Sequence, residues 1–299
     1  MSANIRAVLM PLAIILGIFL PELHSLSVLL PYLIGTMMFL TFISEVPPQR
    51  HGFTFRISVR ALLSGLFLIG ILALLSYFLH LPKEFLLAGI LICLCPPANA
   101  APAMAKILGG NPVLMLKIFI VGHLIACFSI PLLFGFVSHS GSLETFRDMA
   151  FAIFNKMQSI VTIPLALALG IRSFYPEIAD KLVRFQKWTV CIWSFAVFVI
   201  ISNAGYQVRG MQNLDLHIFV GMAILSLVLC VLLFILGYYT EKNGHPFEAS
   251  QSMGQKNTVL IILLAQTFAK DLPLVVLGPI WYVIWQNLVL SYMAAKAKK

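Results

Sequence analysis

The sequence predicts an all-α protein that crosses a membrane ten times. Of its 299 residues, 60% are hydrophobic and only 10% are charged, and the mean hydropathy is +0.97. Soluble domains carry about 25% charged residues. Apolar runs of about 20 residues recur along the whole chain, which excludes a single anchor and a β-barrel of short alternating strands. The chain is therefore a polytopic membrane protein in contact with the lipid bilayer.

The apolar runs give ten predicted spans in order. The first follows one basic residue, Arg6, and ends in Pro21-Glu22 without a small-x-small cleavage pattern, so we expect it to be retained. The fourth and ninth spans are interrupted by residues that break a helix. The predicted spans are Ile5–Leu20, Leu26–Ser44, Arg56–Leu79, a broken Lys83–Leu108, Val113–Val137, Thr145–Ile171, Leu182–Ala204, Leu216–Thr240, a broken Pro246–Phe268, and Leu272–Ala294.

Basic residues predict the orientation. With the N-terminus in the cytoplasm, fourteen of the 20 lysines and arginines fall on the cytoplasmic side, five fall on the other side, and Lys256 lies inside the membrane. This is the expected positive-inside asymmetry, so the net charge of +9 reflects orientation and not a nucleic-acid partner. An even number of spans places both termini in the cytoplasm of a multi-pass protein of the cell inner (cytoplasmic) membrane.

The two interruptions predict an internal repeat. Division near Ser140-Gly141 gives halves of five spans, residues 1–140 and 141–299, which must face opposite ways in the membrane. Each half has its broken helix in fourth place, at 83–108 and 246–268. Inverted repeats with broken helices bind substrates and ions near the midplane of the bilayer, where the breaks lie.

The first break, Cys95-Pro96-Pro97-Ala98-Asn99, lacks two backbone donors because Pro96 and Pro97 have no N–H. Asn99 precedes Ala100-Ala101-Pro102, as an N-cap residue would precede a new half-helix. In lipid, freed peptide groups survive only where protein or an aqueous cavity shelters them. The break is therefore expected to face inward.

The second break repeats this pattern. Gly254 loosens the backbone, and Asn257 precedes Thr258-Val259-Leu260, where another half-helix would begin. Each half-helix N-terminus presents unpaired N–H groups and about half a positive charge, so two converging N-termini favour an anion. Capping without any contact to a substrate is the alternative role of both asparagines.

Three motifs in this order resemble the bile acid:sodium symporter family, in a bacterial member. They are Cys95-Pro96 followed by Gly110-Asn111, Gly254 and Asn257 where the family has Glu-x-Gly-x-Gln-Asn, and Trp285-Gln286-Asn287 where relatives often have Trp-His-Asn. The resemblance implies ten helices, two of them broken and crossing, in a core domain (56–138 and 216–295) that moves against a panel domain (5–46 and 145–204). Gln286 and Asn287, far from the predicted ends of the last span, are expected to face the core and contact substrate, and the resemblance supports this role for Gln286.

The chain departs from this family where relatives bind sodium. The signature glutamate and glutamine are replaced by Ser252 and Lys256, and the resemblance aligns the other sodium ligands with Ala101, Pro102, Met115 and Phe119. Hard cations need oxygen ligands, which those four side chains do not supply. We therefore expect no metal and no cofactor, with the sodium sites of the family lost.

Lys256 is the expected replacement. In relatives the site holds one glutamate and two Na⁺, and here it holds Ser252 and one protonated lysine; the net charge is the same. The ammonium is therefore predicted to take the electrostatic role of sodium and to attract an anion. A lysine that gains its proton only with substrate gives proton symport; one that stays protonated gives a uniporter. The alternative is a lysine that extends to an aqueous vestibule as a constant counter-charge.

Other ionisable residues are weaker candidates. Lys117 is expected to extend to the cytoplasmic surface, and His123 is either a proton shuttle or a hydrogen-bonded packing residue. Glu45 and Glu248 fall near predicted helix ends and are expected at the interface. The five cysteines lie in apolar stretches and are expected to pack as small hydrophobes.

The function predicted is secondary transport of a small organic anion by alternating access, without sodium. An ordinary sodium-coupled organic anion or bile acid symporter and a non-transporting membrane sensor are the alternatives. An intramembrane aspartyl enzyme is excluded because it needs two carboxylates in one site, whereas the aspartates lie in or beside predicted loops. A channel would show rings of repeated polar residues. The sequence favours no particular oligomeric state.

Overall fold

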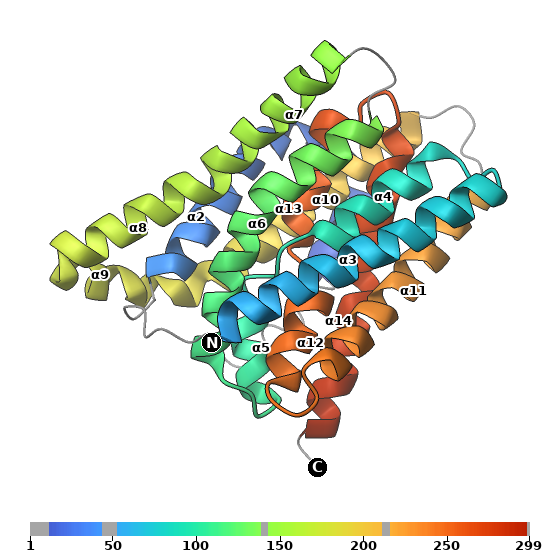
Figure 1. Ribbon diagram of the computed structural model, residues 1–299. Helices are drawn as coiled ribbons and strands as arrows, with labels where there is room; N and C mark the ends of the chain where they lie inside the picture. Colours follow the sequence, from blue (N-terminus) through green and yellow to red (C-terminus); the bar gives the residue numbers. More distant parts are fainter. Residues whose placement is uncertain (1–11, 44–52, 139–142, 211–215, 298–299) are drawn as a thin grey trace. The chain divides into compact units, whose positions relative to one another are not determined.

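The computed structural model describes residues 12–43, 53–138, 143–210 and 216–297 (Figure 1). These residues form helices joined by short connections, and within them the extended backbone is limited to one isolated β-bridge. The chain divides into two compact units, Met1–Pro47 with Asn155–Leu214 and Pro48–Phe154 with Asp215–Lys299. The predicted movement of a core domain against a panel domain stays a prediction.

In the first unit, residues 12–19 are helical and the 3₁₀-helix η1 (Pro21–Leu29) leads into α2 (Leu30–Ile43). α2 packs against α8 (Ile163–Phe174) and α10 (Thr189–Gly210). The remaining elements of this unit are the π-helical turn η2 (Gln158–Thr162), α9 (Pro176–Val183) and the 3₁₀-helix η3 (Arg184–Trp188). Arg172 of α8 ties the unit together, because its guanidinium donates to the Ile43 carbonyl at 2.7 Å and pairs with Asp180 at 2.7 Å.

The second unit contains both interrupted helices. Its elements are α3 (Phe53–Phe78), α4 (Lys83–Leu94), α5 (Ala101–Ile107), α6 (Pro112–Ser138), the larger part of α7 (Leu143–Met157), α11 (Leu216–Thr240), α12 (Pro246–Gly254), α13 (Thr258–Phe268), the 3₁₀-helix η4 (Pro273–Val276) and α14 (Leu277–Ala297). α3, α4 and α6 pack on one another, and α11 packs along α12 and α14 (Figure 1).

The helices match a multi-pass membrane protein. Within the described ranges, six helices are long and apolar enough to cross a bilayer, or up to seven if one bent pair counts as a single span. α3 shows the expected distribution of side chains, since Phe67, Leu74 and Tyr77 are exposed whereas Ile57 and Leu72 are buried. Apolar side chains on the outside of a long helix suit contact with lipid.

The predicted span limits agree with most of these helices. α11 runs from Leu216 to Thr240 as predicted, and the second broken span begins and ends at the predicted residues. The predicted span Leu182–Ala204 is different: Pro176 starts the separate helix α9, and a 3₁₀ turn precedes α10. Part of the first predicted span, residues 5–11, lies outside the described residues, and the ten-span inverted repeat stays a prediction.

Candidate functional site

The two interruptions pair with each other. The Ala98 N–H donates to the Gln255 carbonyl at 2.8 Å, and the Asn257 N–H donates to the Pro96 carbonyl at 2.9 Å, which forms a short antiparallel bridge between Pro97 and Lys256. Peptide groups that helical bonding would have left unpaired are thus satisfied between the breaks, as an apolar interior requires. The helices are interrupted between α4 and α5 and between α12 and α13.

Small residues allow the breaks to lie close to neighbouring helices. A Cβ atom on Gly122 of α6 would lie 2.8 Å from Cδ of Pro97, and a Cβ atom on Gly65 of α3 would lie 2.8 Å from the Cys93 carbonyl oxygen. Larger side chains at these two positions would push the first break away. Close backbone approach at small residues is the usual way in which helices associate in membranes.

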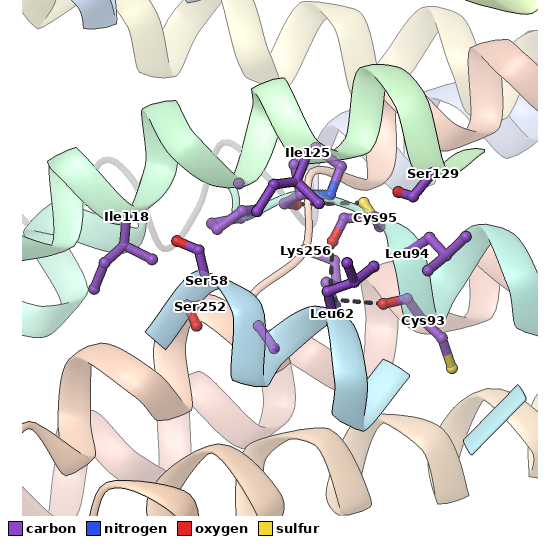
Figure 2. Close-up of a pocket in the computed structure, with 14 residues that line it drawn as sticks. Ser58, Leu62, Cys93, Leu94, Cys95, Ile118, Ile125, Ser129, Ser252 and Lys256 are labelled. Atoms are coloured by element: carbon purple, nitrogen blue, oxygen red, sulfur yellow. Dashed lines mark hydrogen bonds between the residues drawn. The ribbon is translucent and has the colours of Figure 1, made fainter. Parts of the chain in front are cut away.

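Lys256 binds the end of α4. Its side-chain ammonium donates to the carbonyl oxygens of Cys95 at 2.8 Å and Cys93 at 3.3 Å, and the residue is 3% exposed (Figure 2). The last carbonyls of a helix have no partner within the helix and carry a partial negative charge. The ammonium supplies both the missing donors and the opposite charge, and it lies inside the unit instead of extending to an aqueous surface.

A small cavity adjoins this ammonium. It has a volume of about 40 Å³ and is lined by Ser58, Ser129, Ser252 and Lys256, among others (Figure 2). The Ser58 hydroxyl donates to the Thr54 carbonyl at 2.9 Å and the Ser252 hydroxyl to the Ala249 carbonyl at 3.1 Å, so the oxygens of these hydroxyls remain as acceptors. A water molecule needs roughly 10–15 Å³ of such space, so the cavity has room for water beside the third ammonium hydrogen.

Asn257 caps α13 as predicted, but Asn99 does not cap α5. The Asn257 side-chain oxygen accepts from the Leu260 N–H at 3.4 Å. The first break makes an extra turn, in which the Ala101 N–H donates to the Ala98 carbonyl at 2.9 Å, and α5 begins after Ala100. Both polar atoms of the Asn99 side chain are buried and have no hydrogen-bond partner among the described residues, so its predicted capping role is wrong.

α14 holds the second break in place. The Gln286 side chain accepts from the Lys256 N–H at 3.0 Å and donates to the Lys256 carbonyl at 3.4 Å. One turn earlier, the Tyr282 hydroxyl donates to the Gly254 carbonyl at 2.8 Å. Asn287 binds its own helix, through the Val283 carbonyl at 2.6 Å. Tyr282 was not predicted, although its i, i+4 spacing to Gln286 places both residues on one helix face.

Glu248 lies near the start of α12, as expected from the sequence, and is buried within the protein; its place at the membrane interface stays a prediction. Glu248 is 2% exposed and accepts from the Asn111 N–H at 2.5 Å, with the His245 ring nitrogen Nδ1 at 3.6 Å. It is buried because the N-terminal part of α12 packs against α6, where the carboxylate binds the backbone N–H just before the first residue of that helix. Glu45 lies outside the described residues.

A second buried carboxylate was not predicted. Glu241, at the end of α11, is 4% exposed and pairs with Arg56 at 2.7 Å and with Arg60, both on α3. Arg60 also donates to the Thr240 carbonyl at 2.8 Å. Arg56 and Arg60 precede Glu241 by 185 and 181 residues, so no local sequence pattern connects them with it.

Apolar packing occupies the positions that the resemblance aligned with sodium ligands. Ala101 and Met115 are completely buried in a cluster with Ile57, Leu114 and Ile118. Phe119 is also buried, and its ring lies 4.2 Å from the ring of His123. The described residues contain no group of three His, Cys, Asp or Glu side chains that could hold a metal ion.

Two comparisons with known proteins bear on this site. No curated protein matches the chain. The family model described as the Sodium Bile acid symporter family matches residues 66–211, just under half of the chain. The matched part runs from within α3 through α10 and includes the first break. This part of the chain is therefore similar to a family of membrane transporters.

Proposed function

We propose that this protein is a secondary transporter of a small organic anion, working by alternating access without bound sodium. The observation that carries the proposal is the hydrogen bonding of the Lys256 ammonium to the Cys93 and Cys95 carbonyls at the end of α4. A cation held by backbone oxygens at a helix break is the electrostatic arrangement that a bound sodium ion would provide. Here the cation is part of the chain.

The surroundings favour an anion as the transported group. Lys256 directly precedes Asn257, the cap of an 11-residue half-helix whose first N–H groups carry partial positive charge. Among the residues that the structure describes, no carboxylate side chain lines the adjoining cavity. We assign substrate contacts to Asn99, Asn257, Gln286 and Asn287 together with Lys256, and the buried unpartnered amide of Asn99 supports its part in this set.

We assign the coupling of substrate transport to proton movement to Lys256 and Ser252, which line the same cavity. We assign the helix breaks to Pro96, Pro97 and Gly254. The prolines lack an N–H, and Gly254 allows the close approach of Phe234, whose ring a Cβ would overlap. The cavity has room for water between the ammonium and the neighbouring hydroxyls. Release of the Lys256 proton after each delivery gives symport of proton and anion, whereas permanent protonation gives a uniporter.

Uptake by purified protein in liposomes tests the proposal. The probes are a radiolabelled bile salt, a steroid sulfate, and a set of three- to six-carbon mono- and dicarboxylates, each measured without sodium, with sodium, and with a pH gradient in potassium buffer. We expect saturable uptake of at least one probe without sodium. Strict dependence on sodium would establish the ordinary symporter type, and absence of saturable uptake for every probe would favour a sensor.

A further inference from the structure

His123 of α6 makes two hydrogen bonds, one within its own helix and one to the second break. The residue is completely buried, with ring nitrogen Nδ1 at 2.8 Å from the Phe119 carbonyl oxygen and Nε2 at 3.3 Å from Nδ2 of Asn257. The Asn257 side-chain oxygen is used by the Leu260 N–H. One histidine thereby connects α6 to the residue that caps α13.

The chemistry of these partners fixes the proton positions. A carbonyl oxygen only accepts, so Nδ1 must carry a hydrogen, and the Leu260 N–H only donates, so it must meet the oxygen of the Asn257 amide. The amide nitrogen of Asn257 then faces Nε2, which has to be an acceptor without a hydrogen. A protonated ring would place two donors opposite each other. Only the neutral ring with hydrogen on Nδ1 satisfies all three contacts.

We propose that His123 is a positioning residue that fixes the amide of Asn257 so that it presents an N–H donor at the crossing of the breaks. One Nδ2 hydrogen goes to His123, and the second has no partner among the described residues. The group offered is therefore a donor, which suits a ligand with acceptor oxygens such as a carboxylate or a sulfonate. This last step rests on the proposed transport of an organic anion, whereas the positioning does not.

Nitrogen NMR of the protein in lipid nanodiscs tests the positioning without a ligand. The sequence has 7 histidines, and the His123→Gln variant identifies the signals of this ring in ¹⁵N-histidine-labelled protein. We expect a protonated Nδ1 and an unprotonated Nε2 at neutral pH. In Asn257→Asp a carboxylate faces the ring, so Nε2 should become protonated. A wild-type ring with hydrogen on Nε2, or no change in Asn257→Asp, would overturn the proposal.

A double-mutant cycle in thermal unfolding provides a second test. If His123 acts through Asn257, the fall in Tm of the His123→Met, Asn257→Ala double variant should be clearly smaller than the sum of the two single falls. The matched control pairs Asn257→Ala with Ile130→Met, another buried position on α6, where the falls should add. Additive falls for the His123 pair would contradict the proposal. If both tests succeed and no probe anion is transported, the positioning stands and the proposed function fails.

Discussion

Substitution of Lys256 by methionine removes the charge with little change in side-chain volume. Two buried carbonyl oxygens, those of Cys93 and Cys95, lose their donor in this variant. An unsatisfied buried acceptor costs about 1–3 kcal/mol, which destabilises the variant, whereas removal of an ammonium from a buried position relieves a desolvation penalty of several kcal/mol. The two effects oppose each other, so we expect the variant to fold and its Tm to change little.

The effect on transport should be much larger than the effect on folding. An anion about 4–8 Å from the ammonium gains roughly 2–4 kcal/mol at an effective dielectric constant near 20. Since 1.4 kcal/mol is a factor of ten, the loss corresponds to a fall in kcat/KM of roughly 30- to 1,000-fold. The assay is sodium-free uptake into proteoliposomes, with the Tm of the same preparations measured alongside.

The matched control is Lys296→Met, which removes the same charge from an exposed position near the end of α14. In this variant kcat/KM should stay within a factor of two of the wild type and Tm within about 2 °C, because exposed charges contribute little to stability or to the field at the site. Wild-type kcat/KM in a folded Lys256→Met variant would refute the role given to the ammonium.

Three further substitutions test the packing and polar contacts around the site. Glu241→Gln removes the charge that pairs with Arg56 and Arg60 and should lower the free energy of unfolding in denaturant titrations. The loss should be only about 1–3 kcal/mol because both arginines are half-buried. The control Glu144→Gln, at a carboxylate 77% exposed, should have no effect, and equal stability of both variants would contradict a stabilising role of the Glu241 ion pairs. Gly122→Ala places a methyl group against Pro97 and should reduce uptake and cost about 1–3 kcal/mol, whereas Gly70→Ala meets nothing within 4 Å and serves as the control. Gln286→Leu leaves the Lys256 peptide group without its side-chain partner and should lower the unfolding free energy by about 1–3 kcal/mol, a loss that wild-type stability in the same titration would rule out.

Local chemistry made the two breaks predictable. Pro96 and Pro97 together remove two backbone donors, Gly254 loosens the backbone at the end of α12, and Asn257 stands directly before the half-helix that it caps. Asn99 has the same local appearance, yet the Ala98–Ala101 turn shifts the start of α5 and removes the asparagine from the capping position. One extra backbone turn therefore explains why Asn257 caps a helix and Asn99, in a similar sequence context, does not.

Contacts between distant segments were the part that the sequence does not carry. The sequence predicted that Lys256 lies at membrane depth. The partners of its ammonium are backbone carbonyls 163 and 161 residues earlier in the chain, and every residue type possesses such a carbonyl. Glu248 lies near a helix end, as its place in the sequence suggested, but its burial depends on packing against residues 137 positions earlier. Such burial follows from tertiary packing, and helical periodicity within a short segment contains no information on it.

A covalently attached cation limits how the proposed carrier uses energy. A sodium ion can leave the site after each delivery, whereas Lys256 can change its charge only by releasing a proton. If the ammonium keeps its proton, no ion accompanies a monoanion, and a complete cycle moves one negative charge against an inside-negative potential, at a cost of about 2.3 kcal/mol per 100 mV. If the proton leaves with the substrate, the cycle is electroneutral for a monoanion and the pH gradient drives it. In the first case uptake responds to a potassium diffusion potential and in the second to the pH gradient. The fate of one proton on Lys256 therefore decides the direction in which the carrier accumulates its substrate.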